Sequence, residues 1–86
     1  MEDYPFLMEA ISKVLERLRT DAGFSKRKLA AISGIDRVYL LQVEQGKYRP
    51  TINFMFLLAK GLGISVTDLI NQIEQEQKAL CRKYQK

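Results

Sequence analysis

The residues of this chain that could do chemistry are mainly basic side chains, and they gather in its central third. Between Arg19 and Arg49 there are seven basic residues and three acidic ones, so this stretch alone carries the formal net charge of +4. The basic residues are Arg19, Lys26, Arg27, Lys28, Arg37, Lys47 and Arg49. A local basic patch is typical of a domain that binds a polyanion. Taken alone, it is equally compatible with solvated surface lysines and arginines.

Other kinds of chemistry have little support in the sequence. The chain has no histidine, and Cys81 is its only cysteine. A structural zinc site needs about four Cys or His ligands, so none is expected, and Cys81 is interpreted as an inert thiol. Neither a glycine-rich phosphate loop nor a nucleophile elbow is present. We therefore expect no enzymatic activity, no cofactor and no metal.

Length and composition indicate one globular domain over residues 1–86. Hydrophobic residues make up 47% of the chain and charged residues 28%, which is ordinary for a folded protein. No apolar run approaches the roughly 18–20 residues that span a bilayer. The first ten residues contain three acids and no basic segment, unlike a secretory signal. These features predict a cytoplasmic protein without a membrane partner.

Periodicity predicts one long helix at the N-terminal end of the chain. Asp3 or Tyr4 can cap it, Pro5 suits its first position, and Gly23 suits the left-handed residue just past its end. Its apolar stripe consists of Leu7, Ile11, Val14, Leu15 and Leu18.

Two very short helices are predicted next. Ser25 is the expected N-cap of the first, which ends at Gly34, and Asp36 is the expected N-cap of the second, which ends at Gly46. Neither helix is long enough to be stable alone, so the two must pack together at a steep angle. The residues expected to face the core are Leu29, Ala30, Leu40 and Val43, with Ile32 as a further candidate.

The C-terminal half predicts two more helices. Thr51 is the expected cap of the fourth, which is apolar on most of its surface and is interpreted as the central core helix. Ser65 and Asp68 resemble a capping box that opens the fifth helix. Its expected buried residues are Val66, Leu69, Ile70 and Ile73. No strand-like alternation appears, so the predicted fold class is all-α with five helices.

The order of these signals resembles the phage repressor and Cro helix-turn-helix family of Xre-like regulators. The motifs that carry the resemblance are Gly23-Phe24-Ser25, Leu29-Ala30, Gly34-Ile35-Asp36, Leu40, Glu44-Gln45-Gly46-Lys47, Pro50-Thr51, Leu58-Ala59 and Leu62-Gly63-Ile64-Ser65. The match covers about residues 8–70, and residues 71–86 form a C-terminal helical extension. The resemblance implies a five-helix, lambda-repressor-like DNA-binding domain whose second and third helices form the helix-turn-helix.

The resemblance also implies which side chains contact the bases of double-stranded DNA. Arg37, Val38 and Gln42 match the family's base-reading positions, and Leu41 lies beside them. Arg37 can bind guanine O6 and N7, and Gln42 can bind adenine N6 and N7. Val38 or Leu41 can pack against a thymine methyl group. The alternative for each is an ordinary solvated surface residue.

Phosphate contacts are expected on both sides of these base-reading residues. The candidates are Ser25, Lys26, Lys28, Tyr39, Lys47, Tyr48 and Arg49. Ser25 and Lys26 lie at a helix N-terminus, which favours an anion. Lys26 departs from the family, which often has glutamine there. Tyr39 has two open interpretations, a hydroxyl that donates to phosphate or a ring that lies on the protein surface.

The resemblance further implies an Arg19–Glu44 ion pair beneath the interface, interpreted as structural. It also implies a homodimer on a palindromic operator, since one such domain covers about half of a site. Surplus apolar residues near the termini are candidates for the dimer interface or for additional core packing; they are Phe6, Leu7, Leu80 and Tyr84.

Several alternatives remain open at this stage. Phage repressors, restriction–modification controllers and antitoxins are not separated by sequence, and a toxin or RNA polymerase is a further candidate partner. The alternative function is a helix-turn-helix fold that binds another protein instead of DNA.

Overall fold

The computed structural model describes residues 1–84, which form five α-helices and no strand. The helices are α1 (Leu7–Asp21), α2 (Lys26–Ser33), α3 (Arg37–Glu44), α4 (Ile52–Leu62) and α5 (Val66–Tyr84). The predicted fold class is confirmed. Helix α5 continues through the predicted C-terminal extension to Tyr84, and residues 85 and 86 of that extension lie outside the described residues.

Local capping interactions begin four of these helices at the positions that the sequence predicts. The hydroxyl of Ser25 accepts a hydrogen bond from the Lys28 N–H at 3.0 Å, which starts α2. The side chains of Asp36, Thr51 and Ser65 cap α3, α4 and α5 in the same way, each accepting from the N–H three residues on. Each cap satisfies one of the N–H groups that a helix start leaves without a partner.

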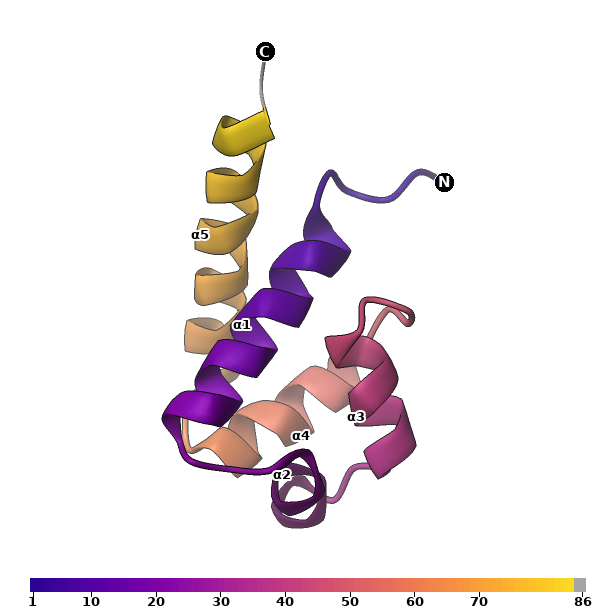
Figure 1. Cartoon of the computed structure of the whole chain (residues 1–86), viewed down its shortest axis with the longest axis vertical. Helices are drawn as coiled ribbons and strands as arrows, with labels where there is room; N and C mark the ends of the chain where they lie inside the picture. The colour runs from indigo at the N-terminus through magenta and orange to yellow at the C-terminus, as the bar shows by residue number, and fades with distance from the viewer. Residues whose placement is uncertain (85–86) are drawn as a thin grey trace.

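Two long helices and three short ones enclose one apolar core. Helices α1 and α5 lie side by side, α4 crosses at their lower end, and α2 and α3 pack on α4 and α1 (Figure 1). Every helix contributes to the core, whose fully buried members are Ala10, Val14, Leu15, Leu29, Leu40, Leu58, Val43 and Leu69. A core shared by all five helices holds α2 and α3 in place, because helices of this length are not stable alone.

The start of α1 differs from the prediction. Neither Asp3 nor Tyr4 caps the helix, which begins only at Leu7. Instead Phe6 precedes it with a left-handed φ of 60° and no side-chain cap, and Pro5 lies in the turn before it. The cause is tertiary, because Gln77 donates to the Pro5 carbonyl at 3.0 Å and the Phe6 ring stacks on a ring of α5.

The predicted burial of Ile70 is wrong, and part of the apolar surface of α4 is exposed as well. Helix α4 buries Phe54, Met55, Leu58 and Ala59, yet Ile52 remains 67% exposed and Ile70 of α5 remains 43% exposed. A helix covered by neighbours on one side only leaves its other side in solvent, whatever its residue types.

In the described part of the chain, no single helix is long and apolar enough to cross a membrane; α4 and α5 reach that length only together, bent by 105°.

Candidate nucleic-acid interface

The turn between α2 and α3 positions the candidate interface. Gly34 ends α2 in the left-handed region with φ of 69°, a conformation that costs a residue with a Cβ about 1 kcal/mol or more. The Ile35 N–H then donates to the Ala30 carbonyl at 2.9 Å, closing the end of α2. Asp36 follows directly as the cap of α3. The chain therefore changes direction within three residues, as the sequence predicts.

Helix α3 has an inner and an outer side, and they divide as predicted. Leu40 and Val43 are completely buried and anchor the helix to the core. The candidate base-reading residues lie on the other side. Arg37 and Val38 are exposed, Val38 by 54%, while Leu41 and Gln42 are half-buried. The anchoring of α3 is thus confirmed, whereas contact with bases stays a prediction.

The first turns of α2 and α3 together form a basic hollow. It has a volume of about 300 Å³ and is lined by Lys26, Arg27, Arg37, Val38 and Leu41. A predicted phosphate residue and three predicted base-reading residues therefore share one surface. Arg27 was not among the predicted site residues. Its place between two lysines in the first turn of a capped helix was the signal that could have found it.

The start of α2 suits an anion for a second reason. The Ser25 oxygen accepts from the Lys28 N–H, so its own O–H remains able to donate. The N–H groups of the first helical turn lack intrahelical partners and carry the positive end of the helix dipole. The start of α2 thus combines hydrogen-bond donors with positive charge, which come from Ser25, Lys26 and Lys28.

The loop from Lys47 to Pro50 is held in place by Tyr39. The Tyr39 hydroxyl donates to the Arg49 carbonyl at 3.2 Å, and its ring stacks on Tyr48 with centroids 6.0 Å apart. On its other side the ring lies against Phe54, at 5.0 Å. These contacts support the surface interpretation of Tyr39, because its proton is already used within the protein. They also keep Tyr48 and Arg49 beside the end of α3.

Arg49 has a partner of its own in the N-terminal segment. Its guanidinium lies 2.8 Å from the carboxylate of Asp3, with both side chains more than half exposed. An exposed pair of this kind is worth about 0–1 kcal/mol and is readily exchanged for another anion. Arg49 therefore remains available as a candidate phosphate contact.

The Arg19–Glu44 ion pair that the resemblance implies is present. Two parallel hydrogen bonds of 2.9 and 3.1 Å join the guanidinium to the carboxylate, and both side chains are largely buried. Arg19 also donates to the Phe24 carbonyl at 3.0 Å, and Ser12 donates to the Glu44 carbonyl. The pair thus ties α1, the turn before α2 and the end of α3 together, behind the candidate interface.

The four residues predicted for the dimer interface make contacts within the chain. Leu80 is buried, Leu7 packs against the core, and the Phe6 ring stacks on Tyr84 with centroids 5.5 Å apart. These contacts correspond to the alternative of additional core packing; a role in a dimer stays a prediction. Among residues 1–84, no group of three or more His, Cys, Asp or Glu side chains is arranged to hold a metal ion.

Comparison with known proteins places the chain in a family. The helix-turn-helix family model matches residues 15–69, which include α2, α3 and the turn between them. The uncharacterised HTH-type transcriptional regulator y4dJ of Sinorhizobium fredii is 32% identical over 59 residues, covering 69% of this chain and 77% of the relative.

Two solved structures extend the likeness to the whole fold. The clp gene regulator ClgR of Corynebacterium glutamicum has a TM-score of 0.83 at 26% identity, covering 94% of this chain and 86% of that one. The restriction–modification controller protein C.Esp1396I, solved as a tetramer with its natural 35-base-pair operator, has a TM-score of 0.76 at 29% identity, covering 85% and 96%. The chain therefore belongs to the Cro/C1-type helix-turn-helix family of DNA-binding transcriptional regulators.

Proposed function

We propose that this chain is a sequence-specific regulator that binds a two-fold symmetric operator as a homodimer, with α3 in the major groove. The observation that carries the proposal is the division of α3. Leu40 and Val43 are buried and fix its inner side, which leaves Arg37, in the basic hollow, and the half-buried Gln42 for its outer side. In helix-turn-helix proteins the N-terminal residues of the second helix contact base edges.

The side chains on this outer surface supply complementary kinds of base contact. Arg37 suits guanine, Gln42 suits adenine, and Val38 with Leu41 suits a thymine methyl group. Positive charge on either side of α3, at the start of α2 and in the 47–49 loop, suits the two phosphate strands that border the groove. We assign Arg27 to the phosphate contacts as well, since it lines the same hollow.

A homodimer follows from the size of the interface. One α3 covers about half of an operator, and dimers of this motif bind half-sites about 34–36 Å apart. The tetramer of C.Esp1396I on its operator supports assembly on DNA and favours the controller subtype over a phage repressor or antitoxin. We place the protein in the cytoplasm, with DNA and a second copy of itself as partners.

Selection of bound sequences from a random DNA pool tests the proposal directly. We expect the selected sequences to converge on a palindrome whose half-sites are about one helical turn apart. Footprinting on the selected site should protect both halves. Binding that is equally strong to every sequence in the pool would contradict sequence-specific recognition.

A further inference from the structure

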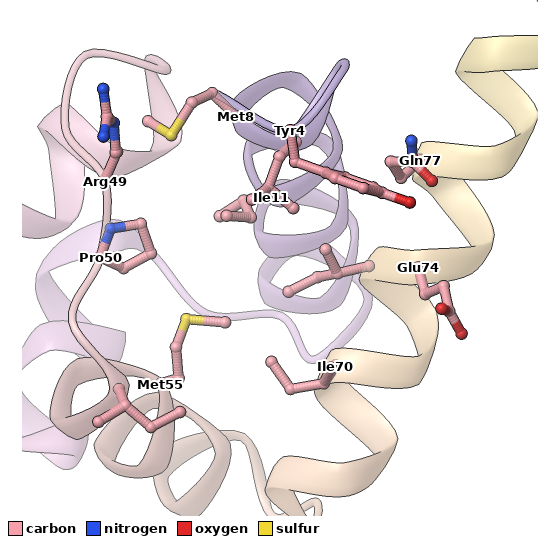
Figure 2. A pocket seen from close by; sticks show the side chains of 12 residues that line it. Tyr4, Met8, Ile11, Arg49, Pro50, Met55, Ile70, Glu74 and Gln77 are labelled. Carbon is pink, nitrogen blue, oxygen red and sulfur yellow. The ribbon is translucent and has the colours of Figure 1, made fainter. Parts of the chain in front are cut away.

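An apolar groove with a volume of about 440 Å³ lies between α1, α4 and α5 (Figure 2). Its floor consists of Ile11, Met55 and Ile73, which are almost completely buried, while Ile52 and Ile70 line it and stay exposed to solvent. A concave and mostly apolar surface of this size, with a few polar groups, is typical of a small-molecule site. The polar groups in its lining therefore indicate what kind of molecule it suits.

Arg49 supplies the positive charge of this groove. Its backbone is held in place, because its carbonyl accepts a hydrogen bond from the Tyr39 hydroxyl. Its guanidinium already binds one carboxylate, that of Asp3 at 2.8 Å. Glu74 lies on the opposite side, on α5, with its carboxylate turned outward (Figure 2). The groove thus combines an apolar floor with a cation on one side that accepts a carboxylate.

The segment before α1 is fixed beside the groove by Gln77. The buried amide of Gln77 donates to the Pro5 carbonyl at 3.0 Å and to the Cys81 sulfur at 3.1 Å. Tyr4, the residue before Pro5, lines the groove and extends towards α5 (Figure 2). Asp3 precedes Tyr4 and reaches Arg49. One short segment therefore supplies both a wall of the groove and the carboxylate that occupies its cation.

We propose that this groove binds a small apolar carboxylic acid. The carboxylate of the acid replaces that of Asp3 on Arg49, and its hydrocarbon chain lies on the floor of the groove. The exchange is easy because an exposed ion pair such as Asp3–Arg49 contributes little to stability. Removal of the hydrocarbon chain from water then favours the bound state. A strand of nucleic acid suits the groove less well, since its charges would lie against apolar side chains.

A bound acid would compete with DNA, and this part of the inference rests on the proposed function. Arg49 is a candidate phosphate contact in the 47–49 loop. A carboxylate in the groove neutralises its guanidinium and adds a negative charge beside the phosphate strand, which weakens the attraction between the two. The acid therefore acts as an effector that lowers affinity for the operator.

Isothermal titration calorimetry of the full chain with octanoate, without DNA, tests the site. We expect saturable binding of one octanoate per chain. Each CH₂ added between hexanoate and octanoate should tighten binding about fourfold, because the chain lies on apolar surface. Octan-1-ol, which lacks the negative charge, should bind about fivefold more weakly than octanoate.

Two substitutions test the contact between the carboxylate and Arg49. In Arg49→Gln the preference for octanoate over octan-1-ol should disappear, because the charge that distinguishes them is gone. In Asp3→Asn the preference should increase, because no carboxylate of the protein competes for the guanidinium. A preference that stays unchanged in Arg49→Gln would overturn the inference.

A charge placed in the groove tests where the hydrocarbon chain lies. Ile70→Asp should weaken octanoate binding at least tenfold, because it puts a carboxylate against the chain. The matched control is Ile32→Asp on α2, at a core candidate that the structure leaves 40% exposed, and it should leave octanoate binding unchanged. Circular dichroism checks folding. If Ile70→Asp is unfolded, Ile52→Asp takes its place, since an acid suits the first turn of α4. Equal binding by the folded groove variant and the unmodified chain would overturn the inference.

Fluorescence anisotropy with the selected operator separates this inference from the proposed function. Octanoate should lower operator affinity severalfold and reduce the slope of log affinity against log salt by about one unit. The operator should weaken octanoate binding by the same factor. Bound octanoate that leaves operator affinity unchanged would overturn the competition for Arg49. Failure of the proposed function would abolish operator binding without octanoate, whereas failure of this inference alone would not.

Discussion

The guanidinium of Arg37 and the ammonium of Lys28 are both exposed on the helix-turn-helix, yet their positions predict different effects when each is removed. Arg37 lies on the outer side of α3, where a bidentate contact with one base is possible. We expect Arg37→Ala to lose about 1–3 kcal/mol of discrimination at one base pair. Affinity for the selected operator, and for operators altered at each position, measures this loss.

Lys28→Ala is the matched control for that experiment. Its side chain is a candidate phosphate contact, so its removal should weaken binding to every sequence alike. The slope of log affinity against log salt should also fall by about one unit. If Arg37→Ala instead weakened operator and random DNA equally, Arg37 would be a phosphate contact and the base-reading assignment would be wrong.

Among the helices, the Arg19–Glu44 pair determines how α3 sits against α1. Glu44→Ala would leave a largely buried guanidinium without its carboxylate, so we expect a loss of roughly 3 kcal/mol in the free energy of unfolding. Replacing both residues by apolar ones of similar size, Arg19→Met with Glu44→Leu, should recover most of that loss. Urea unfolding of the single and double variants measures both effects. If the loss in the double variant equalled the sum of the losses in the two single variants, the two side chains would not be coupled.

The contact between α2 and α4 predicts an effect that runs against helix propensity. Gly61 lies in the last turns of α4, where alanine would ordinarily stabilise a helix by about 1 kcal/mol. A Cβ at this position would lie 1.9 Å from the Ser33 Oγ and 3.2 Å from the Ser33 Cα, so the two helices would have to separate. We therefore expect Gly61→Ala to lower the free energy of unfolding by about 1–3 kcal/mol, measured in urea.

A second substitution shows whether the crowding is the cause. The Ser33 hydroxyl is buried and has no hydrogen-bond partner, so Ser33→Ala alone should be neutral or stabilising. In the Ser33→Ala background, the effect of Gly61→Ala should be smaller, because the closest clash is gone. A stabilising Gly61→Ala in the unmodified chain would mean that α2 and α4 pack less closely than the structure has them.

How far the sequence predicts these elements depends on how local each cause is. Ser25, Asp36 and Thr51 cap their helices through bonds to residues three positions away, so their roles are visible in sequence. The left-handed Phe6 and the bond between Tyr39 and Arg49 depend on contacts with other elements, which residue patterns do not encode.

The exposure of Ile52 and Phe56 shows the same limit for burial. Both lie in an apolar helix that periodicity assigns to the core, but only the packing of α2 and α5 decides which side of α4 is covered. The outer side of α3 was predictable because the buried Leu40 and Val43 are spaced as on one helical face. The exposed side of α4 was not, because apolar residues surround that helix.

At the scale of the whole molecule, the proposed dimer makes stability depend on protein concentration. The chain is small, with 86 residues, and a domain of this size buries only about 60–65% of the surface that its unfolded form exposes. Burial of apolar surface in the proposed homodimer would add to this modest stability. Only folded chains form the dimer, so dimerisation favours the folded state. A tenfold rise in protein concentration should therefore stabilise each protomer by up to roughly 0.7 kcal/mol.

Thermal unfolding measures this dependence without DNA. For a domain of this length, that gain corresponds to a rise in melting temperature of about 3–5 °C for each tenfold increase in concentration. A melting temperature that stays constant across the range of concentrations in which the chain sediments as a dimer would contradict the proposal that the folded chain is a homodimer.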